Sequence, residues 1–203
     1  MKTDVEKAIQ VIKAGGVIAY PTETVYGLGA SVFNDNAIRR IYRIKKRLAT
    51  KGLLVATSNI DQIETISFIN KTAKKIIENF LPGPLTIILF KKEIISNELT
   101  GNKDTIGIRI PDNKFALEII EKTGPITSTS ANISNKPPAK NALDVREQLG
   151  DSVDYIFDGG ECKSGLPSTI LDISDENLPR ILRKGNIEKE TLENFLGKKI
   201  LEV

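Results

Sequence analysis

The chemistry open to this chain is limited first by an absence, because its 203 residues include no histidine. Without histidine, the sequence excludes Ser-His-Asp triads, Cys-His pairs and every His-ligated metal site. The single cysteine, Cys162, excludes an internal disulfide framework and any multi-cysteine metal site. Catalysis must therefore rely on carboxylates, lysines, hydroxyls, backbone amides or groups of the substrate.

Polar and basic residues gather in four short segments. Residues 21–30 (PTETVYGLGA) place two threonines and a glutamate after an expected strand, and residues 43–52 (RIKKRLATKG) contain five basic residues. Residues 127–134 (TSTSANIS) and 165–170 (GLPSTI) are rich in small hydroxyl and amide side chains. In an open α/β sheet, ligands bind at loops beyond the strand ends. Such groups can bind a phosphate, a carboxylate or the edge of a base there.

These compositions also have a plainer interpretation. Ser, Thr and Asn are ordinary turn residues, and basic residues are typical of a solvated helix C-terminus. Arg109 is harder to explain in this way, because it lies between Ile108 and Ile110 in an expected buried strand. A guanidinium in that place needs a carboxylate, a phosphate or a groove. Arg109 is therefore a candidate functional residue.

Two familiar nucleotide motifs fail. Residues 26–29 (YGLG) begin like a dinucleotide fingerprint, but Val32 stands where the third glycine is required. Residues 159–164 (GGECKS) end like a Walker A motif, but Cys162 replaces the glycine before the lysine. Cys162 is therefore interpreted as a loop or packing residue.

Hydrophobic periodicity and capping residues predict alternating helices and strands. The first expected helix begins at a capping box formed by Thr3 and Glu6 and ends at Gly15. The second is capped by Asn34 or Asp35 and extends past Tyr42. Further helices are expected at residues 61–66, 71–80, 112–122, 141–149 and 188–196. Strands are expected at 17–20, 53–57, 85–90, 106–110, 125–128, 155–158, 168–173 and 180–183. This alternation predicts an α/β fold with a largely central sheet that can be mixed.

Composition and charge favour a cytoplasmic globular protein. The longest apolar run, residues 85–90, is too short to cross a bilayer. The first ten residues (MKTDVEKAIQ) lack the apolar region of a secretory signal. The net charge of +3 does not by itself indicate nucleic-acid binding.

Seven segments in a fixed order carry a family resemblance. They are PTETVYGLGA, KKRLATKGLL, LPGPLT, IGIRIPD, STSANIS, GLPSTI and ILRKG. Together they resemble the YrdC-like family of L-threonylcarbamoyladenylate synthases over about residues 7–186, in its short bacterial form (TsaC type). The resemblance implies one domain over residues 1–203, with a C-terminal helix at about 187–196. It implies a twisted open mixed sheet flanked by helices (YrdC-like/RibB-like) around a positively charged central cavity.

The resemblance also implies an activity. The family is a nucleotidyltransferase that condenses L-threonine, bicarbonate or CO₂, and ATP with Mg²⁺ into L-threonylcarbamoyl-AMP, releasing pyrophosphate. This is the first step of N6-threonylcarbamoyladenosine (t6A) modification at adenosine 37 of tRNAs that read ANN codons. The implied partners are the proteins that transfer the threonylcarbamoyl group; direct tRNA binding is left open, and no membrane partner is expected.

The resemblance assigns roles to individual residues. Lys45 and Arg47 are implied to be catalytic through contacts with the ATP phosphates. The threonine-binding residues are implied to be Thr24, Arg109 and Ser168. The implied nucleotide-binding residues are Lys45, Arg47, Lys51, Thr105, Ser128, Ser130, Asn132 and Arg183. No protein side chain is assigned as a metal ligand.

Leu48 and Asn135 are two of the positions that depart from the family pattern. Leu48 stands where proline is usual in the basic segment. Asn135 stands where glycine is expected after SANxS, and asparagine tolerates a positive φ almost as well. Both departures concern the phosphate contacts more than the reaction.

Two alternative functions remain open. The first is that of a YciO-like paralogue with the same fold and a different or weaker activity. Leu48 keeps this function open, because it departs from the proline that is usual in the synthases. The second is an RNA-binding module that holds tRNA or double-stranded RNA on a basic concave surface. The small net charge and the 5% aromatic content argue against this second function, because few side chains can stack on bases.

Overall fold

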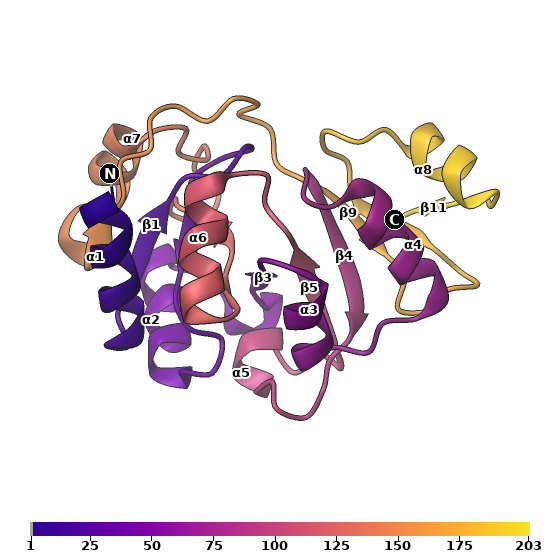
Figure 1. Ribbon diagram of the computed structural model, residues 1–203, viewed down its shortest axis with the longest axis horizontal. Coiled ribbons are helices and arrows are strands. Elements are labelled where there is room, and N and C mark those ends of the chain that lie inside the picture. The colour runs from indigo at the N-terminus through magenta and orange to yellow at the C-terminus, as the bar shows by residue number, and fades with distance from the viewer. Residues whose placement is uncertain (1) are drawn as a thin grey trace.

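The computed structural model describes residues 2–203, which form a mixed α/β fold (Figure 1). The helices are α1 (Lys2–Lys13), α2 (Asp35–Lys45), α3 (Ile60–Ile66), α4 (Lys71–Phe80), α5 (Asn97–Thr100), α6 (Lys114–Thr123), α7 (Ala142–Leu149) and α8 (Lys189–Leu196). The strands are β1 (Ile18–Tyr20), β2 (Gly27–Gly29), β3 (Leu54–Ala56), β4 (Leu85–Phe90), β5 (Thr105–Arg109), β6 (Ile126–Thr127), β7 (Thr129–Ser130), β8 (Tyr155–Ile156), β9 (Thr169–Asp172), β10 (Arg180–Arg183) and β11 (Leu201–Glu202). The expected fold class is confirmed.

The strands divide between two sheets, which corrects the expectation of a single central one. The smaller sheet has the order β7-β2-β1-β8, and the larger has the order β11-β10-β9-β4-β5-β3-β6. Both mix parallel and antiparallel pairs. The sheets meet where β6 continues into β7, and a bridge between Ser31 and Ile126 joins the end of β2 to β6. Residues 125–128 and the segment that follows thus serve both sheets.

The segment at 21–30 was expected to be a loop, but part of it is strand β2, which pairs antiparallel with β1. Its glycines explain how this hairpin packs. A Cβ at Gly29 would lie 3.0 Å from the ring of Tyr20, and one at Gly27 would lie 3.2 Å from it. The fully buried Tyr20 ring therefore lies across a strand that has no side chains at these two positions.

Helix starts follow the capping residues with two corrections. Asn34 and Asn141 cap α2 and α7 as expected. The cap of α6 is Asn113 rather than Asp112, because its Oδ1 accepts from the amides of Phe115 and Ala116 at 3.0 and 3.2 Å. Helix α1 is already formed at Lys2, so Thr3 lies within it and does not cap it.

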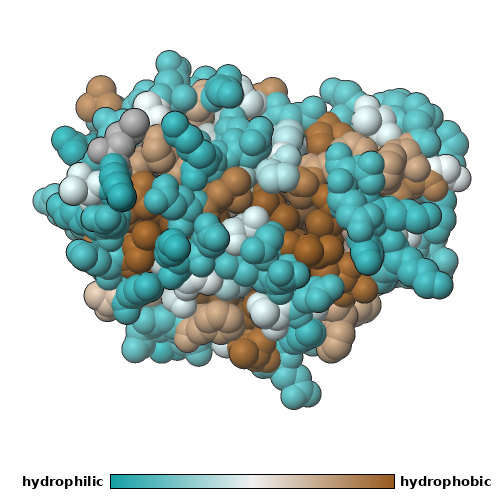
Figure 2. Space-filling view, viewed as in Figure 1, coloured by the Kyte–Doolittle hydropathy of each residue, from teal (hydrophilic) through white to brown (hydrophobic). Residues whose placement is uncertain are grey.

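The helices cover the sheets in two halves (Figure 1). Helices α1 and α6 pack over β1, where Val5, Ala8 and Ile12 contact a core that includes Ile119 and Ile120. Helices α4 and α8 lie in the other half, beside β4 and β9. Figure 2 shows hydrophobic side chains gathered in the hollow between the two halves. None of the helices within residues 2–203 combines the length and the hydropathy needed to cross a membrane.

The turn after β10 approaches the start of β9 very closely. A Cβ on Gly185 would collide with the main chain of Pro167, Ser168 and Thr169. Because these are backbone atoms at and just before the start of β9, they cannot move aside as a flexible side chain would. Gly185 is therefore required for the position of the Ser168 backbone.

We expect Gly185→Ala to lower the free energy of unfolding by about 1–3 kcal/mol, the usual cost of overpacking. Urea unfolding followed by circular dichroism measures this change. The control is Lys184→Ala at the exposed neighbouring residue, which should change stability by less than about 0.5 kcal/mol. Equal stability of Gly185→Ala and wild type would contradict the close approach.

Candidate functional site

A cavity of about 400 Å³ is lined by residues of both sheets. It contains most of the residues that the sequence predicted for the site, although they come from distant segments of the chain. Those that line it are Thr24, Arg47, Lys51, Thr105, Arg109, Ser128, Ser130, Ser168 and Arg183. Two predicted residues, Lys45 and Asn132, line a smaller adjoining pocket of about 210 Å³ instead.

The charged residues that line the larger cavity are mostly cationic. They are Arg47, Lys51, Lys103, Arg109, Arg183 and a single carboxylate, Asp172. Burial lowers the pKa of the Arg183 guanidinium, and the nearby charges of Arg109 and Arg47 lower it further. Mutual repulsion among these cations would be relieved by an anion, so the cavity suits a ligand that carries negative charge.

Arg109, the candidate from the buried strand, lies at the end of β5 with only 4% of its surface exposed. Its Nη1 donates to Thr24 Oγ1 at 3.0 Å, and its Nη2 pairs with Glu23 Oε1 and approaches the Gly83 carbonyl oxygen at 3.4 Å. Among the described residues, Nε of Arg109 and Oε2 of Glu23 have no hydrogen-bond partner. The buried guanidinium therefore obtains the carboxylate that it requires from Glu23, and it keeps a donor unused.

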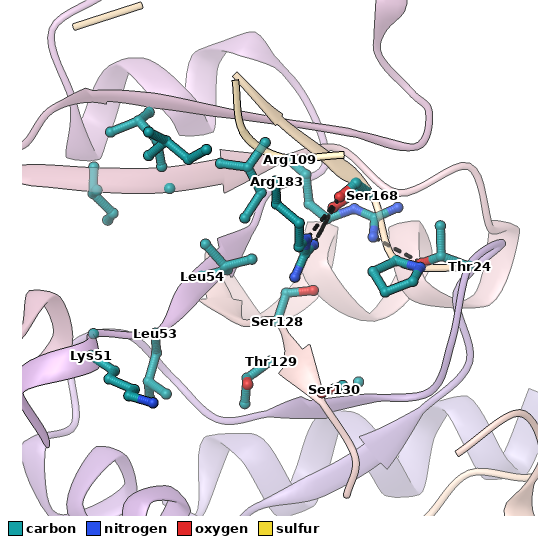
Figure 3. Close-up of a pocket in the computed structure, with 18 of the residues that line it drawn as sticks. Thr24, Lys51, Leu53, Leu54, Arg109, Ser128, Thr129, Ser130, Ser168 and Arg183 are labelled. Atoms are coloured by element: carbon teal, nitrogen blue, oxygen red, sulfur yellow. Dashed lines mark hydrogen bonds between the residues drawn. The ribbon is translucent and has the colours of Figure 1, made fainter. Parts of the chain in front are cut away.

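Arg183 and Ser168 form the neighbouring part of the wall (Figure 3). The Arg183 Nε and Nη2 atoms donate to the Ser168 carbonyl oxygen at 3.1 and 2.9 Å, and Nη2 also lies 3.1 Å from Ser168 Oγ. The same hydroxyl lies 2.8 Å from Thr86 Oγ1. Figure 3 shows this group beside Arg109 and Thr24, with Ser128 facing it across the cavity. The hydroxyls and guanidinium groups thus converge on one region.

Lys45 is almost completely buried, with 2% of its surface exposed, at the end of α2. Its Nζ donates to the carbonyl oxygens of Ser130 and Asn132, the latter at 2.8 Å, and to Asn132 Oδ1 at 3.3 Å. Burial, with a further contribution from the charge of Arg47, lowers the pKa of Lys45 to about 7. The ammonium group therefore ties α2 to the segment after β7.

Arg47 also contacts backbone. Its Nε and Nη2 donate to the Gly52 carbonyl oxygen at 3.1 and 2.9 Å, and Nη2 donates to the Lys51 carbonyl oxygen at 3.1 Å. These bonds close the turn that carries Lys51 into the cavity. Leu48, in the same turn, has φ −65°, the value that proline imposes. Leucine therefore adopts the backbone conformation of the usual proline.

Asn135, the other departure, has φ 69°. The expectation that asparagine takes the positive φ of the usual glycine is confirmed.

Several residues near the site were not among those predicted individually, and three of them bear on its polar contacts. Glu23 was noted only as a carboxylate in the 21–30 segment, and pairing it with Arg109 requires tertiary structure. Thr22 lies 2.8 Å from Thr24 through their Oγ1 atoms. Asp172 had a sequence signal, because the alternation Ser168, Ile170, Asp172 places it on the face of β9 that carries Ser168.

Comparisons with known proteins agree with this geometry. The Sua5/YciO/YrdC family model, described as "Telomere recombination", matches residues 10–185. The threonylcarbamoyl-AMP synthase of Pyrococcus abyssi is 39% identical over 188 residues, which is 92% of this chain and 55% of that protein. This chain therefore spans about half the length of that relative.

Two solved structures share the fold. P. abyssi Sua5 complexed with L-threonine superposes with a TM-score of 0.94 at 36% identity, covering 98% of this chain and 59% of that one. Escherichia coli YciO superposes with a TM-score of 0.86 at 28% identity, covering 95% and 94% of the two chains. The family match over most of the sequence and the agreement of the folds show that this chain belongs to the Sua5/YciO/YrdC family.

Proposed function

We propose that this protein condenses L-threonine, bicarbonate or CO₂, and ATP into L-threonylcarbamoyl-AMP and releases pyrophosphate, the first step of t6A formation in tRNA. The observation that carries the proposal is the single cavity in which Arg109 and Thr24 lie beside Arg183 and Ser168. The name of the P. abyssi relative and the L-threonine in the P. abyssi Sua5 structure support the choice of substrate.

The proposed division of roles follows from the chemistry of each side chain. The planar Arg109 guanidinium suits the threonine carboxylate, and the hydroxyls of Thr24 and Ser168 suit its polar groups. Arg47, Lys51 and Arg183 supply positive charge for the triphosphate, with Thr105, Ser128 and Ser130 as nucleotide contacts. Lys45 and Asn132 act from the adjoining pocket.

The proposed reaction needs no protein nucleophile. The threonine amine adds to CO₂ and loses a proton, which gives a carbamate. A carbamate oxygen then attacks the α-phosphorus of ATP, and the bond to the β-phosphate breaks as pyrophosphate leaves. The protein contributes by holding the two substrates together and by neutralising the charge that develops on the phosphates. A chain without histidine can supply both effects.

ATP is proposed to enter as its Mg²⁺ complex. Within residues 2–203, no group of three or more Asp, Glu or Cys side chains is placed to hold a metal ion. The ion therefore fits as a part of the substrate, held by phosphate oxygens.

The direct test measures pyrophosphate release from ATP and Mg²⁺, with and without L-threonine and bicarbonate, and identifies the adduct by mass spectrometry. We expect release to require both co-substrates and to yield threonylcarbamoyl-AMP. Release that is indifferent to threonine would contradict the proposal and favour a different activity of the kind kept open by the YciO likeness.

Arg109→Lys should raise the KM for threonine about 10- to 100-fold, the value of a lost charge-assisted hydrogen bond. The substitution keeps a cation beside Glu23 but removes the planar fork. The KM for ATP should remain unchanged. The control is Arg180→Lys, an exposed arginine at the start of β10. An equal rise in both KM values for Arg109→Lys would contradict the proposed roles.

Lys45→Met should have two effects. It should lower the free energy of unfolding by about 1–3 kcal/mol, because the carbonyl oxygens of Ser130 and Asn132 lose their donor. It should also raise the KM for ATP, since Lys45 holds the segment that carries these two residues. Urea unfolding and initial rates measure the two effects. A less stable variant that uses ATP normally would show that Lys45 serves the fold alone.

A further inference from the structure

One row of residues across the larger sheet lines the cavity. Strand register places Leu54 on β3 beside Gly107 on β5, Gly107 beside Ile88 on β4, and Ile88 beside Asp172 on β9. All four residues line the cavity. Their side chains share one face of the sheet because adjacent strands are in register.

The first three residues of this row make a flat apolar surface. A Cβ on Gly107 would collide with the Leu54 side chain and would lie 3.0 Å from Cδ1 of Ile88. The missing side chain therefore lets Leu54 and Ile88 lean together over the strand. Both are partly exposed, whereas Val55 and Ile87 beside them are fully buried in the core. A planar apolar ring can lie on a surface of this kind.

Asp172 closes this surface with a carboxylate of fixed orientation. Its Oδ1 accepts from the Ser174 amide at 3.0 Å and from Ser174 Oγ at 2.7 Å. Among the described residues, its Oδ2 accepts no hydrogen bond and forms no ion pair. Since neighbouring strands are about 4.8 Å apart, a ring lying over Ile88 would bring its edge within reach of this oxygen.

The guanidinium groups of Arg109 and Arg183 belong to the next row of the larger sheet, on β5 and β10. Ile170 on β9 pairs with Arg183 on β10 and with Thr86 on β4, and Arg109 follows Gly107 by two residues on β5. Two residues of a strand span about 7 Å. An apolar row that ends in a carboxylate therefore adjoins the Arg183 guanidinium, which matches a nucleotide with its base on this row and its phosphates toward Arg183, while Arg109 holds the threonine carboxylate in the proposed division of roles.

We propose that the row Leu54, Gly107, Ile88 and Asp172 is the base-recognition site for the nucleotide, and that Asp172 Oδ2 selects adenine by accepting a hydrogen bond from its 6-amino group. This inference rests on the proposed use of ATP. Guanine carries an oxygen at the same ring position, which repels a carboxylate. Purine, with only hydrogen there, leaves the carboxylate without a partner.

The test compares ATP with purine riboside triphosphate, which lacks the 6-amino group, in wild type and in Asp172→Asn. Equilibrium binding of each nucleotide in the presence of Mg²⁺ is measured without threonine, so the result does not depend on turnover. Wild type should bind ATP about 10- to 100-fold more tightly than purine riboside triphosphate. In Asp172→Asn this preference should fall to near unity, chiefly through weaker ATP binding, and binding of GTP should improve.

Asp175→Asn is the matched control, because Asp175 is exposed three residues further along the chain and does not line the cavity. It should keep the preference for ATP. Thermal unfolding of each variant verifies that the fold is intact. Gly107→Ala provides an independent test, since the added methyl group should weaken both triphosphates equally by displacing Leu54 and Ile88.

A stable Asp172→Asn variant that retains the wild-type preference for ATP would overturn the proposal, even if that variant binds both nucleotides more weakly than wild type. These outcomes can be told apart from failure of the proposed function. If the synthase activity is absent but ATP binds with the predicted preference, the base-recognition site stands. If threonylcarbamoyl-AMP forms but the preference for ATP does not depend on Asp172, the proposed reaction stands and the base-recognition site does not.

Discussion

The buried guanidinium of Arg109 is the interaction on which the site depends. It lies on β5 of the larger sheet, and its partners Thr24 and Glu23 follow β1 of the smaller sheet. A charge buried this deeply is tolerated only with a partner, and removing one member of such a pair costs about 3–5 kcal/mol. The need to neutralise Arg109 therefore holds the two sheets in a fixed relation, with the cavity beside their junction.

The pleat of the larger sheet divides that cavity by polarity. Because side chains alternate between the two faces, Val55, Ile87, Ile108 and Leu171 point into the core, while the cavity is lined by Leu54, Ile88, Gly107, Arg109, Ile170 and Asp172. Along the strands, the row at Gly107 is apolar and the next row contains Arg109 and Arg183. A slip of one residue would exchange cavity and core side chains, so the register determines both.

The basic segment shows how cations can shape a site through bonds to backbone carbonyl oxygens. Lys45 and Arg47 donate to backbone carbonyl oxygens and so hold the turns that carry Ser130 and Lys51. Burial lowers the pKa of Lys45 to about 7, and carbonyl oxygens of the neighbouring backbone accept its hydrogen bonds. Leu48 leaves this turn in the conformation that proline would give it. Charge in this segment therefore serves the geometry of the cavity wall.

The sequence by itself predicted the mixed α/β class, most helices and strands, the caps Asn34 and Asn141, and the residues that gather in the cavity. Local signals suffice for the fold class, the helices and strands and the caps, because side-chain periodicity and capping act over a few residues. The site residues other than Arg109 were implied by the family resemblance of the seven ordered segments. Sequence could state that Arg109 needs a carboxylate, but it could not select Glu23, which is 86 residues away. It could not divide the strands between two sheets, because strand pairing joins segments that are far apart in the sequence. It could not recognise β2, because two of its three residues are glycines, which have low β-propensity. The row from Leu54 to Asp172 likewise exists only through the register of four strands. Only the tertiary structure decides that register, because contacts between segments that are distant in the sequence fix the strand pairing.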